Sequence, residues 1–82
     1  MTWNYRVVRR KQESGVEEWS YAFGIHEAYY DKGKSKPHSV TQESIEPFGE
    51  TLEELQRDFL MMADALTRPV LDYETREVVD GD

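Results

Sequence analysis

The sequence contains no cysteine among its 82 residues. Disulfide bonds, thiolate metal sites and cysteine nucleophiles are therefore excluded. A chain of this length forms one small domain and buries only about 60–65% of the surface that the unfolded chain exposes. Its stability must come from one hydrophobic core, or from a core that a dimer interface extends. We expect a single domain over residues 1–79 and a frayed tail at residues 80–82.

Long apolar runs are also absent. No stretch approaches the roughly 20 apolar residues that a membrane-spanning helix needs. The opening segment, MTWNYRVVRR, lacks the apolar centre and the small-residue cleavage site of a signal peptide. We therefore expect a cytoplasmic protein.

Positive charge is scarce in the second half of the chain. The net charge is −7, of which residues 1–41 contribute +2 and residues 42–82 contribute −9. The acidic half disfavours the wrapping of nucleic acid, because phosphate contacts supply most non-specific affinity. It would attract a basic protein partner, although a solvated acidic surface is the simpler interpretation.

Two segments, residues 2–11 and 17–30, predict an antiparallel hairpin. In both, apolar or aromatic residues alternate with polar or small ones at period two, which is typical of a half-buried strand. The intervening Glu13, Ser14 and Gly15 favour a turn. Gly33 predicts a second turn, and residues 39–45 predict a short, polar edge strand.

Residues 51–67 predict a helix. Thr51 is a suitable N-cap, and Glu54 completes a capping box. The apolar residues that follow are spaced by three and four, which places them in one stripe. Pro69 ends the helix. Residues 70–79 either return to the sheet as a short fourth strand or form a loosely attached tail.

Together these segments predict an α+β fold, in which one helix packs on one face of an antiparallel sheet of three or four strands. The predicted core combines the aromatic face of the hairpin with the helical stripe. Its members are Trp3, Tyr5, Val7, Trp19, Tyr21, Phe23, Ile25, Leu52, Leu55, Phe59, Met62 and Leu66.

Candidate catalytic and metal-binding residues are few. His26 and Glu27 begin an H-E pair, but Tyr30 stands where a zinc-protease helix needs its second histidine. In a strand, moreover, neighbouring side chains point to opposite faces. The one other histidine, His38, gives no third ligand. The chain has neither a G-x-S-x-G motif nor a glycine-rich phosphate loop. We expect a non-enzymatic protein with no catalytic residue, metal or cofactor.

A single helix covers only one face of such a sheet, so the other face is either solvated or paired with a second copy. Small residues on that face would permit close approach, and a methionine opposite the helical stripe offers a second contact point. The candidate interface residues are Ser20, Ala22, Gly24 and Met61. We therefore favour a protein-interaction or regulatory module that binds a protein partner or itself.

Nucleic-acid binding is the alternative. Basic residues on the first strand and in the loop after the second lie near aromatic ones, as on surfaces that stack bases. The candidate contacts are Arg6, Arg9, Arg10, Lys11, Lys32, Lys34 and Lys36. The aromatic residues, however, fall on the face that the helix is predicted to cover, which favours the protein-interaction hypothesis.

The motif GETLEEL at residues 49–55, with its apolar continuation to Leu66, resembles the start of the helix in HicB-type antitoxin domains. This resemblance implies three strands followed by a helix. The layout of IHEAYYD, GETLEEL and RPVLDYE is also similar to a group of small uncharacterised bacterial proteins. That similarity implies a compact domain without an assigned activity.

Overall fold

The computed structural model describes residues 2–13 and 19–79. The predicted turn at Ser14 and Gly15 and the predicted frayed tail at residues 80–82 lie outside this part of the chain. The elements are, in order, β1 (Thr2–Glu13), β2 (Trp19–Tyr30), β3 (Ser39–Val40), α1 (Leu52–Ala63), the 3-10 helix η1 (Asp64–Thr67) and β4 (Leu71–Asp72).

The predicted α+β class is confirmed. The four strands form one sheet in the order β3-β2-β1-β4. β1 pairs with β2 and β2 with β3 in antiparallel fashion, whereas β4 runs parallel to β1. The sheet is therefore mixed, because the chain returns to the outer edge of β1 after the helix. Within the described residues, no helix is long and apolar enough to cross a membrane.

The β1–β2 hairpin has two faces of different character. Its register places Val8 opposite Gly24 and Val7 opposite Ile25. Because successive side chains alternate between faces, the even-numbered residues of both strands share one face, here called the even face. The odd-numbered residues share the other, here called the odd face.

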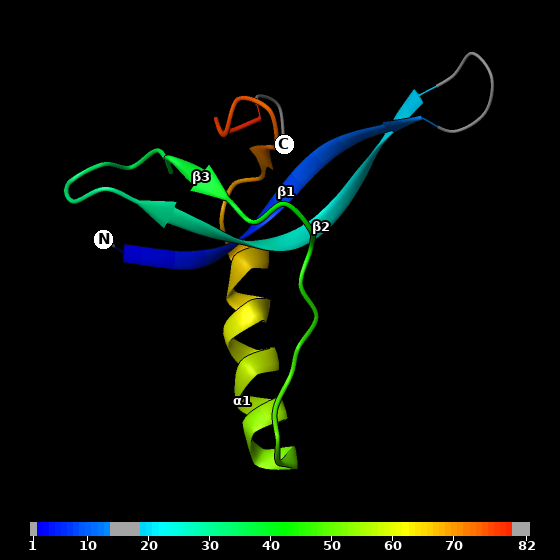
Figure 1. Cartoon of the computed structure of the whole chain (residues 1–82), viewed down its shortest axis with the longest axis vertical. Helices are drawn as coiled ribbons and strands as arrows, with labels where there is room; N and C mark the ends of the chain where they lie inside the picture. The colour runs from blue at the N-terminus through cyan, green and yellow to red at the C-terminus, as the bar shows by residue number, and fades with distance from the viewer. Residues whose placement is uncertain (1, 14–18, 80–82) are drawn as a thin grey trace.

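The hydrophobic core lies on the even face. Val8, Ala28, Tyr30 and Leu71 are buried together, and Tyr73 and Val40 pack against them. The segment of residues 70–79, which carries β4, covers this face, while α1 extends from the opposite side of the sheet (Figure 1). Residues 70–79 are thus anchored to the fold through the buried Leu71 and Val79 rather than forming a loose tail.

The predicted core was assigned to the wrong face. Of its members, only Val7 and Met62 are buried; Tyr5 and Ile25 are half-buried, and the side chain of Trp19 lies outside the description. The remaining predicted core residues are exposed: Trp3, Tyr21, Phe23, Leu52, Leu55, Phe59 and Leu66. The physical reason is the direction of the helix, which points away from the sheet (Figure 1). It meets the odd face only in its C-terminal half, from Asp58, which bonds to Tyr5, to the buried Met62.

The third strand is shorter than predicted. β3 covers only residues 39–40 of the expected residues 39–45. Two further backbone bonds nevertheless keep this segment beside β2, since Thr41 N donates to Glu27 O and Ile45 N to Ile25 O, both at 2.9 Å. The residues between them bulge away from the ladder.

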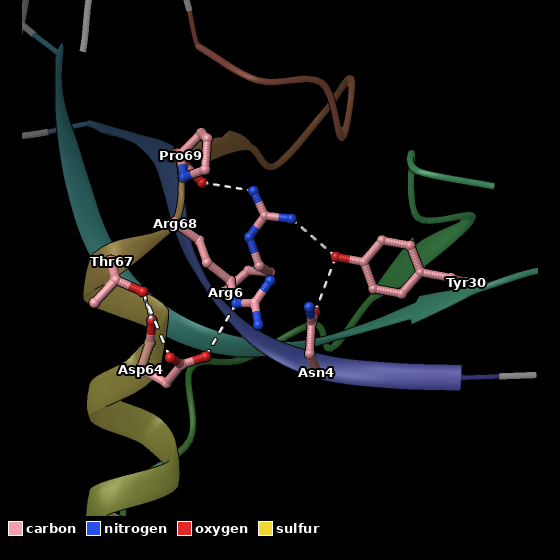
Figure 2. A network of polar contacts seen from close by, with 7 residues as sticks. All are labelled: Asn4, Arg6, Tyr30, Asp64, Thr67, Arg68 and Pro69. Carbon is pink, nitrogen blue, oxygen red and sulfur yellow. Dashed lines mark hydrogen bonds and ion pairs between the residues drawn. The ribbon is translucent and has the colours of Figure 1, made fainter. Parts of the chain in front are cut away.

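Arg6 joins the segment that follows η1 to the β1–β2 hairpin. Its Nη2 donates to the carbonyl oxygen of Pro69 at 2.7 Å, and its Nη1 donates to the Tyr30 hydroxyl at 2.9 Å. Tyr30 in turn donates to the Asn4 side chain at 2.9 Å. Figure 2 shows this network beside the end of η1, where Arg68 pairs with Asp64 at 3.0 Å. The chain is thereby fixed as it crosses from the odd face to the even face.

Candidate interaction surface

The start of α1 is held by local hydrogen bonds. The Thr51 hydroxyl accepts from Glu54 N at 3.1 Å, as the capping box predicts. The Glu54 carboxylate accepts from Glu50 N at 3.1 Å. Gly49 packs against this turn, and a Cβ there would lie 2.3 Å from Leu55 N. Only glycine permits so close an approach of backbone to backbone, so the preceding chain lies directly on the helix.

Asp58 fixes the helix to its neighbours. One carboxylate oxygen accepts from the Tyr5 hydroxyl at 2.8 Å, and the other accepts from Phe48 N at 2.9 Å. Burial, together with the hydrogen bond to the Asp58 carboxylate, raises the pKa of Tyr5 to about 12. The phenol therefore remains a donor at physiological pH, and the contact between β1 and α1 persists.

A stripe of exposed apolar side chains runs along α1 and η1. We call it the α1 apolar face, and it consists of Leu52, Leu55, Phe59, Leu60 and Leu66. Phe59 is 58% exposed and Leu66 72% exposed, although both belong to the periodic stripe that normally packs on a core. The stripe has formed as the sequence predicts, but within the described chain little covers it.

Two adjoining hollows flank Phe59. The first, of about 330 Å³, lies between α1 and the odd face, and Ile25, Ile45 and Leu66 contribute to its walls. The second, of about 540 Å³, lies along the helix and is lined by Pro47, Leu55, Gln56, Phe59 and Leu60. Since Pro47 and Phe59 border both, the two hollows form one continuous apolar surface.

The candidate interface residues of the sequence analysis do not come together. Ser20, Ala22 and Gly24 lie on the even face of β2, whereas Met61 lies on the helix on the opposite side of the sheet. A Cβ at Gly24 would lie 2.8 Å from the Cβ of Ser44, so the chain's own residues make the close approach that Gly24 permits. Met61 is 51% exposed and borders a hollow beside Trp3 and Tyr5.

The candidate nucleic-acid contacts are divided between the two faces. Arg9 pairs with Asp72 at 2.8 Å on the odd side, and this bond is the main cause of the lowered pKa of Asp72. Arg10 lies on the even side, donates to the carbonyl oxygen of Gln42 at 2.6 Å and stacks on Tyr73.

The other basic residues do not restore a single basic face. Lys36 lies 3.5 Å from the carboxylate of Glu77, and Arg6 is buried. Lys11 lies on the odd side of β1, while Lys32 and Lys34 remain exposed in the loop after β2. The structure therefore does not gather the seven residues into one surface for a phosphate backbone.

The two histidines have separate partners. His26 is buried, and its Nδ1 lies 2.8 Å from the carbonyl oxygen of Thr41. His38 lies 3.2 Å from Asp31. Glu27 is on the opposite face from His26 and accepts from the Tyr29 hydroxyl, which raises the pKa of Tyr29. Within residues 2–13 and 19–79, no three histidine or carboxylate side chains cluster as a metal site requires.

Sequence reasoning missed this surface because an apolar helical stripe ordinarily indicates a core. The fold and the surface together define an α+β domain with an incompletely covered apolar helix. No protein-family model, curated protein or solved structure matches the chain. The resemblance to HicB-type antitoxin domains rests on residues 49–66 and stays a hypothesis.

Proposed function

We propose that this protein is a small, non-enzymatic, cytoplasmic protein-interaction module, and that its α1 apolar face binds the same face of a second copy. The observation that supports this proposal is the exposure of Phe59 and its neighbours along the helix. Monomeric proteins rarely expose continuous apolar patches of more than a few hundred Å², and larger patches mark interaction sites.

The accessible surface of the single chain is larger than that of a compact monomer of the same mass, as expected for a chain with an uncovered interface. Its accessible surface is 6238 Å², whereas a compact monomer of 9.7 kDa would expose about 5,100 Å². The excess of roughly 1,100 Å² is summed over every exposed part of the chain, and it is larger than the ~800 Å² that each partner buries in a stable interface of standard size. The radius of gyration, 14.0 Å, likewise exceeds the ~12 Å expected for 82 residues.

The charges on the helix favour an antiparallel pair. Glu53 and Glu54 lie in the first turn of α1, and Arg68, which pairs with Asp64 within the chain, follows the end of η1. In a two-fold arrangement with antiparallel helices, the acidic first turn of each helix would lie beside the partner's Arg68. The two helix dipoles would then point in opposite directions, which is the favourable arrangement. Phe59, near the middle of the stripe, would lie close to the two-fold axis.

Sedimentation of Phe59→Gln against wild type tests the proposal. We expect wild type to dimerise as its concentration rises. We expect the substitution to weaken the dimer by about thirtyfold, because central aromatic residues in interfaces typically contribute at least 2 kcal/mol. Arg57→Gln is the matched control, since position 57 lies roughly 160° around the same helix from Phe59 and is also exposed.

The proposal fails if wild type remains monomeric at every concentration tested. It also fails if Phe59→Gln dimerises as strongly as wild type while Arg57→Gln is impaired. In that case the polar side of α1, rather than its apolar face, would form the contact.

A further inference from the structure

A second feature, distant from the α1 apolar face, is a cavity of about 430 Å³ on the even side of the sheet. This volume falls in the range of small-molecule sites. Three segments form its walls: β1, the loop that precedes β3, and the segment that follows β4. They place three cationic side chains around one space: Arg6, Lys36 and Arg76.

Arg6 carries a buried charge with no anionic partner. The residue is 7% exposed. Its two hydrogen-bond acceptors, the Tyr30 hydroxyl and the Pro69 carbonyl oxygen, are both neutral. None of the ion pairs formed within residues 2–13 and 19–79 includes Arg6. Its Nε–H is buried and has no hydrogen-bond partner. A buried charge is costly unless an opposite charge and hydrogen bonds compensate for it.

Arg76 contributes a second unsatisfied donor. Its Nε is also buried without a partner. Its backbone has φ of 61°, a left-handed conformation that is uncommon for a residue of this size. Arg76 N donates to Asp72 O at 2.7 Å, so a tight turn after β4 holds this conformation. Strained residues of this kind concentrate at ligand sites.

We propose that this cavity binds a small organic oxyanion, namely a carboxylate or a phosphate group carried on a compact apolar body. The guanidinium groups of Arg6 and Arg76, which both line the cavity, would donate to its oxygens, since guanidinium groups match the geometry of both anions. Lys36 would add charge at the rim, where it now lies 3.5 Å from Glu77.

The remaining wall suits the apolar part of such a ligand. Pro37, Leu71 and Val78 line the cavity beside the cations. The three cations and Glu77 leave a local excess of positive charge, although the chain as a whole carries −7. An anion attracted into this cavity would therefore supply the charge that Arg6 lacks.

Titration with sodium phosphate, sodium acetate and sodium butyrate at constant ionic strength and pH tests this inference, with sodium chloride as the reference. The arginine Nε–H signals are followed by ¹H–¹⁵N NMR. We expect saturable shifts for Arg6 and Arg76 with phosphate or with the carboxylates, and none for Arg57. The phosphate and carboxylate series distinguish the two anions, and tighter binding of butyrate than of acetate would show that the apolar wall takes part.

Arg76→Gln should weaken binding by about tenfold or more, because a hydrogen bond to a charged group is lost. Arg57→Gln, which removes the same charge on the helix, should leave binding unchanged. A melting curve establishes that both variants are folded.

Three results would overturn the inference. The first is an equal response to chloride. The second is unchanged binding by Arg76→Gln. The third is a joint shift of the NMR signals of Arg10, Lys32, Lys34 and Arg6 when a short single-stranded oligonucleotide is added. That result would assign the cations to a nucleic-acid surface. Since the cavity and the α1 apolar face share no residue, these outcomes are independent of dimerisation.

Discussion

Replacement of Leu71 by alanine should destabilise the protein far more than the same change at Phe59, although Phe59 is the larger side chain. Leu71 is 2% exposed and packs against Val8, Ala28 and Tyr30. Buried leucine-to-alanine substitutions typically cost about 2–5 kcal/mol. A domain of 82 residues has a total stability of roughly 4–12 kcal/mol. Leu71→Ala could therefore remove about half of it.

The corresponding loss at Phe59 should be small in a single chain. Complete burial of such a side chain contributes about 1.5–3 kcal/mol, and Phe59 is less than half covered. We therefore expect Phe59→Ala to cost about 1 kcal/mol or less when the protein is dilute. At high concentration its cost should grow, because the proposed dimerisation would stabilise the wild type by mass action and the variant would lose that contribution.

Urea unfolding at a low and a high protein concentration distinguishes these cases. Leu71→Ala should lower the midpoint at both concentrations, whereas Phe59→Ala should do so mainly at the higher one. A loss of 3 kcal/mol or more for Phe59→Ala in dilute solution would refute the reasoning, since a buried Phe would then lie in the single-chain core. A negligible loss for Leu71→Ala would equally contradict the placement of the core on the even face.

Two further predictions concern the attachment of α1. Because the folded-state pKa of Tyr5 is raised from 10.0 to about 12, its contribution to stability should be complete below pH 10 and lost as the pH rises through the folded value. Tyr5→Phe should be less stable at neutral pH, through the lost bond to Asp58, and should show a shallower alkaline decline in urea unfolding between pH 9 and 12. If the stability of wild type and of Tyr5→Phe declined in parallel with pH, the assignment of the alkaline decline to Tyr5 would be contradicted. Gly49→Ala should cost at least about 1 kcal/mol by overpacking, because the added Cβ meets the helix backbone. Gly33→Ala gives a comparison without overpacking, because no neighbour lies within 4 Å and its cost comes from the backbone strain at φ of 78° alone. A Gly49→Ala variant as stable as wild type would show that the chain can move aside.

The elements themselves could be predicted because their causes are local. Thr51 and Glu54 lie three residues apart, and the apolar stripe from Leu52 to Leu66 repeats within single turns, so the helix follows from neighbouring residues. The hairpin likewise follows from alternation at period two. The ion pairs Glu53 with Arg57 and Asp64 with Arg68 are also local, since they join residues four positions apart on one side of the helix.

The core could not be assigned to its face in this way. Both faces of the hairpin alternate with the same period, and the aromatic residues made the odd face appear to be the inner one. The deciding contacts join Val8 to Leu71, residues 63 positions apart, through the parallel pairing of β4 with β1. Nothing in the local pattern of either segment specifies that pairing.

The sequence by itself determined the hairpin, the capped helix and the absence of cysteine chemistry, since each depends on composition or on residues a few positions apart. Only the tertiary structure decided what these elements cover. It buried the even face beneath the C-terminal segment and left Phe59 exposed on a helix that points away from the sheet (Figure 1). It also gathered Arg6, Lys36 and Arg76 around one cavity. The physical reason is that burial and charge pairing depend on distances in space, which long-range packing sets and sequence spacing does not.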